Sequence, residues 1–130
     1  MNHRVTLTVT SLLSAVLFSL HWADEVSRGL EKGTLTAYPG ILILAGWLCA
    51  TLVFSERRWG LVIVLLYSLL AATVPFLHMM GRGLVEGRYA TNANLLFWVW
   101  TNVALGACGI LSFVLSIRVL WSTRAAATIR

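Results

Sequence analysis

The residues best equipped for chemistry lie in a short segment of the chain, from residue 21 to residue 28. His21, Asp24, Glu25 and Arg28 stand at relative positions i, i+3, i+4 and i+7. Because these intervals match the repeat of an α-helix, a helix that continues past Ala23 places all four side chains on one face. Imidazole and carboxylate groups bind metal ions and carry protons. The segment is therefore a candidate binding site.

A second histidine, His78, is expected at the same level of the molecule. A helix that starts at Trp59 reaches His78 after roughly 28 Å, and one that starts at Val5 reaches His21 after roughly 24 Å. Pro75 precedes His78 by three residues and removes one helical hydrogen bond there. The two imidazoles are thus predicted to lie at similar depth.

Three chemistries are open to these groups. A transition-metal ion would use His21 and His78 together with Glu25 or Asp24 as ligands. A b-type haem would use the two imidazoles, facing each other across the bundle. A proton or cation path would use Asp24 and Glu25 as its outer groups, with Asn102 and Tyr67 deeper in the molecule. No carboxylate occurs in the middle of an apolar stretch to complete such a path.

The full candidate site, called here the outer cluster, comprises His21, Asp24, Glu25, Arg28, His78, Arg82, Asn94 and Asn102. A competing interpretation is that its acids only pair with neighbouring arginines and link the outer loops, while its histidines bond to the backbone. Exposed charge pairs of this kind are common and contribute little to stability.

Long apolar stretches dominate the chain and must position these groups. Hydrophobic residues make up 58% of the 130 residues and charged residues 12%, whereas soluble proteins average about a quarter charged. A helix needs roughly 20 apolar residues to cross the hydrocarbon of a bilayer. Four such stretches occur, at residues 5–23, 38–55, 59–80 and 94–121. We predict an all-α fold, a single four-helix transmembrane bundle over residues 1–130 with antiparallel neighbours.

Charged residues between the stretches predict an orientation. With the amino terminus in the cytoplasm, the inner side holds one acidic residue and six arginines, namely Arg4, Arg57, Arg58, Arg118, Arg124 and Arg130. Cytoplasmic segments retain positive charge, so both termini are expected in the cytoplasm of a bacterial-type inner or plasma membrane. The net charge of +5 then reflects topology and contact with the lipid bilayer. No basic stretch carries the stacking aromatic residues of a nucleic-acid-binding protein.

Small residues recur every four positions in the first and last stretches. They are Ser11, Ala15 and Ser19, and then Ala104, Cys108, Ser112 and Ser116. Helices in lipid associate through close approach of small side chains. These stripes are predicted packing faces, either within the chain or against a membrane-protein partner or a second copy of the chain.

Catalytic motifs are missing from the sequence. Its two cysteines, Cys49 and Cys108, do not form a CxxC pair, and neither HExxH nor GxxxxGK occurs. We therefore expect a small non-catalytic membrane protein, an accessory or structural subunit of a larger membrane complex. The alternative is an autonomous protein that binds a metal, a haem or a small polar ligand at the outer cluster.

Overall fold

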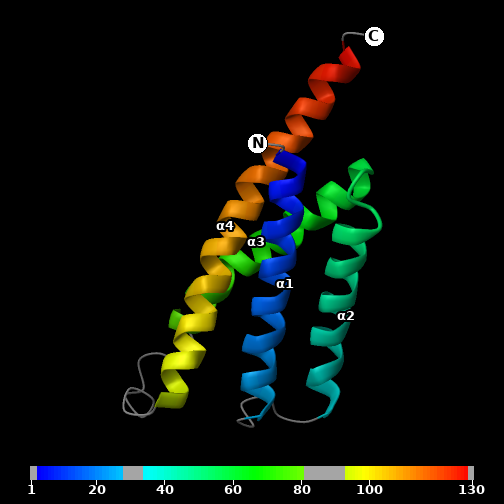
Figure 1. Cartoon of the computed structure of the whole chain (residues 1–130). Coiled ribbons are helices and arrows are strands. Elements are labelled where there is room, and N and C mark those ends of the chain that lie inside the picture. Colours follow the sequence, from blue (N-terminus) through cyan, green and yellow to red (C-terminus); the bar gives the residue numbers. More distant parts are fainter. Residues whose placement is uncertain (1–2, 28–33, 81–92, 129–130) are drawn as a thin grey trace.

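The computed structural model describes residues 3–27, 34–80 and 93–128, which form four helices (Figure 1). The helices are α1 (His3–Ser27), α2 (Thr34–Leu52), α3 (Arg58–Met80) and α4 (Ala93–Thr128). The all-helical prediction is confirmed over these residues.

Three of the helices are long and apolar enough to cross a membrane. The qualifying segments are His3–Ser27, Arg58–His78 and Leu96–Thr123, while the apolar part of α2, Tyr38–Leu52, is shorter. The prediction of a second span over residues 38–55 was therefore too long at its carboxyl end. Apolar composition alone could not detect this end, because the residues just after Leu52 are also apolar.

A tight turn joins α2 to α3 over residues 53–57. The amides of Val53 and Phe54 both donate to the carbonyl oxygen of Cys49, and the Arg57 amide donates to the carbonyl of Phe54. The first turn of α3 lies directly against this connection, since a Cβ atom on Gly60 would collide with the Phe54 carbonyl. Glycine at position 60 therefore permits the close return of the chain.

The first and last helices extend beyond the predicted stretches. α1 continues past Ala23 to Ser27, which is the continuation that the spacing of the polar residues requires. α4 has 36 residues, about 54 Å of helix against about 30 Å of bilayer hydrocarbon. Figure 1 shows its last turns projecting beyond the end of α1.

Helix α4 packs against α1 and α3, and α2 contacts α1 and α3. In Figure 1, α1 lies between α2 and α4, and α3 crosses obliquely behind them. Two glycines of α4 bring it against α3, because a Cβ on Gly106 would strike Pro75 and one on Gly109 would lie 2.6 Å from the Ala72 amide nitrogen. This contact sets the distance between the two backbones.

Two buried apolar clusters fill the interior. One contains Leu7, Ala50, Leu61, Val64, Leu115 and Val119, and the other contains Ala15, Trp47, Ala71 and Leu105. Trp47 stacks on Tyr67 with ring centroids 5.5 Å apart, and its indole N–H donates to Ser11 Oγ at 2.9 Å. This placement explains a tryptophan that is fully buried, since its polar atom is satisfied inside the bundle.

Some residues of each small-residue stripe are buried by the chain's own helices. Ser11, Ala15, Ser112 and Ser116 are fully buried within the chain, whereas Ser19, Ala104 and Cys108 are half-buried or more exposed. At least part of each stripe is therefore covered by the chain's own helices.

Candidate metal centre

Three ligand atoms from two helices meet near one end of the bundle. α1 supplies His21 and Glu25, which are one helical turn apart, and α3 supplies His78. The Nε2 atoms of the two histidines are 3.3 Å apart, and each lies 3.4 Å from Glu25 Oε1. The three atoms therefore form a nearly equilateral triangle.

This triangle matches the geometry of a bound transition-metal ion. Zinc ligands lie about 2.0 to 2.1 Å from the ion in a tetrahedral arrangement, so two ligand atoms of one ion stand about 3.3 to 3.4 Å apart. The three measured separations fall in that range. Among the described residues no fourth His, Cys, Asp or Glu joins the group. The arrangement thus provides three protein ligands and leaves a coordination position for another donor.

Thr101 of α4 orients the His21 ring. Its Oγ1 lies within 3.0 Å of the Phe97 carbonyl and 3.1 Å of the Trp98 carbonyl, to which the hydroxyl donates. The same oxygen lies 3.3 Å from His21 Nδ1, and it accepts the Nδ1–H in the tautomer that carries its proton on Nδ1. His21 Nε2 then carries a lone pair directed toward the other two ligand atoms. A hydrogen bond of this kind is typical of metal-binding histidines, because it fixes both tautomer and ring orientation.

Trp98, one turn before Thr101, forms a wall of the site. Its indole N–H donates to Glu25 Oε1 at 3.3 Å, and its ring centroid lies 5.3 Å from that of His21 and 5.2 Å from that of His78. The side chain is buried, whereas Trp100 two residues later is 70% exposed. Trp98 thus holds the carboxylate in place and covers both imidazoles.

The site is buried on one side and open on another. His21 is 2% exposed, whereas 30% of the His78 side chain is exposed. Desolvated imidazoles and a carboxylate in contact need a shared proton or a cation among them, because their lone pairs otherwise face one another.

The geometry does not fit a b-type haem. Two histidines that ligate one haem lie on opposite faces of the macrocycle, which must pass between them. Here the His21 and His78 rings touch, with centroids 5.1 Å apart in an edge-to-face arrangement. No space for a porphyrin exists between them.

The remaining residues of the outer cluster have different positions. Asp24 is half-buried and does not belong to the triangle of ligand atoms. Asn102 is 1% exposed, and its Oδ1 has no hydrogen-bond partner among the described residues. Arg28, Arg82 and the side chain of Asn94 lie outside the described residues, as do the loop ion pairs proposed for the arginines.

Sequence reasoning missed the contribution of α4 to the site. Neither Trp98 nor Thr101 is among the candidate site residues predicted from the sequence. The available signal was that Trp98, Thr101 and Asn102 share one face of a helix, at i, i+3 and i+4.

No protein family, curated protein or solved structure matches the chain. The chemistry of the site therefore rests on its own geometry.

Proposed function

We propose that this chain is an integral membrane protein that binds one divalent transition-metal ion through His21, Glu25 and His78. The observation that carries the proposal is the triangle of ligand atoms with sides of 3.3, 3.4 and 3.4 Å. The contact between His21 Nδ1 and Thr101 Oγ1 also supports it. In metal-binding histidines, a hydrogen bond at the ring nitrogen that does not bind the metal holds the ring in its orientation.

The donor set favours zinc or ferrous iron. Two imidazole nitrogens and one carboxylate oxygen suit these ions, whereas Cu(I) prefers thiolate and thioether sulfur. Three protein ligands with a further open position are typical of sites that exchange a ligand or release the ion, since structural zinc sites use four. The proposed role is therefore reversible metal binding rather than a purely structural metal.

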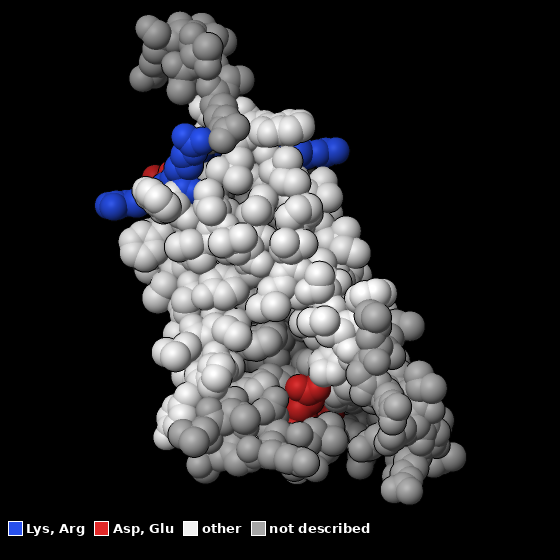
Figure 2. Space-filling model, turned by 180° about the vertical axis from the view of Figure 1, so that it is seen from behind, with Lys and Arg blue, Asp and Glu red and all other residues white. Residues whose placement is uncertain are grey.

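The proposed membrane frame has antiparallel neighbours, both termini in the cytoplasm and the metal centre near the outer surface. The short connection at residues 53–57 supports reversal between α2 and α3. In Figure 2, the Lys and Arg side chains lie toward one end of the molecule together with an acidic side chain, and further acidic side chains lie toward the other end. Positive charge on the cytoplasmic side then supports a bacterial-type plasma membrane orientation with the site outside.

The alternative proposal is an accessory subunit of a larger membrane complex. It is supported by the length of α4 and by its large exposed apolar side chains, Val103, Ile110, Leu111 and Val114. These side chains can contact either lipid or a partner helix. Native mass spectrometry of the protein extracted gently from its source membrane tests this role, since a foreign subunit must be retained with the chain.

Zinc titration of the purified full chain tests the metal proposal. We expect one zinc ion per chain, with binding lost in His21→Ala and in His78→Ala. His3→Ala is the matched control, because His3 is the remaining histidine of the chain and lies at the opposite end of α1 from His21. Equal zinc content in all three variants would exclude the proposed site.

A further inference from the structure

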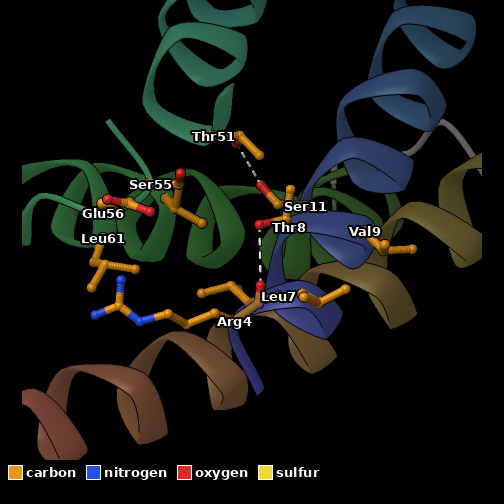
Figure 3. Close-up of a pocket in the computed structure, with 11 residues that line it drawn as sticks. Arg4, Leu7, Thr8, Val9, Ser11, Thr51, Ser55, Glu56 and Leu61 are labelled. Atoms are coloured by element: carbon orange, nitrogen blue, oxygen red, sulfur yellow. Dashed lines mark hydrogen bonds between the residues drawn. The ribbon is translucent and has the colours of Figure 1, made fainter. Parts of the chain in front are cut away.

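A pocket lies about 25 Å away along α1 from the metal centre. It has a volume of about 340 Å³, which is in the range of small-molecule sites, about 300 to 1,000 Å³. Its walls come from the start of α1, the end of α2, the connection at residues 53–57 and the first turns of α3 (Figure 3). None of its lining residues belongs to the outer cluster.

The deep wall of the pocket is apolar. Leu7, Leu61 and Val64 line it and belong to one of the two buried clusters. Val5 and Val9 also line it, and more than half of each side chain is exposed. In a bilayer the exposed side chains of Val5 and Val9 face hydrocarbon, so an alkyl chain is the natural occupant beside them.

Charges of opposite sign flank the pocket at its polar side. Figure 3 shows the Arg4 guanidinium and the Glu56 carboxylate on the same side of the pocket, on either side of Leu61. Arg4 stands at the start of the first apolar stretch, and Glu56 lies in the connection between two helices. Both groups are thus at the depth of lipid head groups in the proposed frame.

A pair of buried hydroxyl groups borders the pocket. Ser11 Oγ and Thr51 Oγ1 are 2.8 Å apart, and Ser11 Oγ also accepts the Trp47 N–H at 2.9 Å. Ser11 is 0% exposed and Thr51 2%, so these hydroxyls join α1 to α2 and do not reach a ligand in the pocket.

We propose that this pocket binds one aminophospholipid of the cytoplasmic leaflet. The phosphate accepts hydrogen bonds from Arg4, and the primary ammonium donates to Glu56. The acyl chain lies along the exposed apolar side chains that line the pocket, Val5 and Val9. This proposal depends on membrane insertion but not on the metal centre.

The Glu56 carboxylate is expected to distinguish among lipid classes. An anionic head group such as phosphatidylglycerol brings no positive group to Glu56 and is repelled by it. A quaternary ammonium such as that of phosphatidylcholine is positive but carries no N–H to donate. A primary ammonium has both the charge and three donors, so phosphatidylethanolamine is the expected ligand.

Native mass spectrometry of the full chain tests this selectivity. The protein is reconstituted in vesicles with equal molar amounts of phosphatidylethanolamine, phosphatidylglycerol and phosphatidylcholine, and the retained lipid is identified. We expect one phosphatidylethanolamine per chain. Equal retention of the three lipids, or retention of another class, would overturn the proposal.

Variants of Glu56 and Arg4 test the role of each charged group separately. Glu56→Gln should lower the ratio of retained phosphatidylethanolamine to phosphatidylcholine about tenfold, and Glu56→Lys should shift the preference to phosphatidylglycerol. Arg4→Gln should reduce retention of all three lipids by about the same factor. Arg118→Gln is the matched control, because Arg118 does not line the pocket.

Zinc binding of each variant is measured alongside as a check of the fold. An unchanged lipid profile in both Glu56 variants, with zinc binding intact, would show that the carboxylate selects no lipid. Loss of lipid selectivity with intact zinc binding would support the pocket. A wild-type chain that binds lipid selectively but no zinc would reject only the metal proposal.

Discussion

The Nδ1 atom of His21 lies 3.3 Å from Thr101 Oγ1, across the contact between α1 and α4. When the threonine hydroxyl donates to a backbone carbonyl of its own helix, its oxygen accepts the Nδ1–H of His21. The direction of one hydrogen bond thus determines which nitrogen of His21 is free to bind a metal ion.

Thr101→Val tests this relationship. Valine has nearly the same shape but cannot accept a hydrogen bond, so the His21 ring loses its fixed tautomer. We expect zinc affinity to fall about 10- to 100-fold, with Thr101→Ser restoring most of it. Thr73→Val is the control, since the Thr73 hydroxyl bonds only to its own helix. Wild-type affinity in Thr101→Val would exclude the proposed role of the hydroxyl.

Trp98 should report metal binding by fluorescence, because its indole contacts Glu25 and lies beside both imidazoles. We expect zinc to change the tryptophan emission of the wild-type protein and Trp98→Phe to abolish most of that change. Trp100→Phe is the matched control, since Trp100 is exposed. If Trp100→Phe removed the signal and Trp98→Phe did not, the proposed wall of the site would be wrong.

Zinc binding should weaken as the pH falls. Imidazole and carboxylate ligands must be deprotonated to bind a metal ion, so protons compete for the same lone pairs. Each proton released on binding makes the apparent affinity fall about tenfold per pH unit in the range where the ligands are protonated. Zinc titrations at several pH values measure this slope. An affinity independent of pH from about 5 to 8 would contradict ligation by two histidines.

Gly109→Val should disrupt the contact between α3 and α4. Any Cβ at this position lies within 2.6 to 2.9 Å of atoms of Ala71 and Ala72, two of them in the backbone, which cannot move aside as a side chain can. We expect a loss of about 1 to 3 kcal/mol or more in the free energy of unfolding, together with weaker zinc binding because His78 moves with α3. Ala107→Val, at an exposed position of the same helix, should leave the thermal unfolding temperature nearly unchanged.

Residue spacing alone predicted part of the arrangement of the outer cluster. The interval between His21 and Glu25 predicted that both lie on one helical face, and in the structure His21 Nε2 lies 3.4 Å from Glu25 Oε1. The equal depth predicted for His21 and His78 from helical rise agrees with their contact at 3.3 Å. Depth could be predicted because every helix rises by the same amount per residue.

The end of α2 and the role of Trp47 could not be predicted in this way. Val53 and Phe54 are as apolar as the helix before them, so only the backbone hydrogen bonds to Cys49 mark the turn. Trp47 is interior because Ser11 accepts its N–H and Tyr67 stacks on its ring. Both partners come from other helices, and no local pattern identifies them.

The sequence by itself determined the helices, their apolar character and the residue types able to bind a metal, because these depend on local periodicity and composition. The tertiary structure decided which of those residues meet. The rotation of each helix about its axis brings Trp98 and Thr101 to His21, and the close contact of Gly106 and Gly109 with α3 fixes how near His78 can come. Rotation and separation depend on packing between segments far apart in the chain, and the periodicity of a single helix contains no information about them.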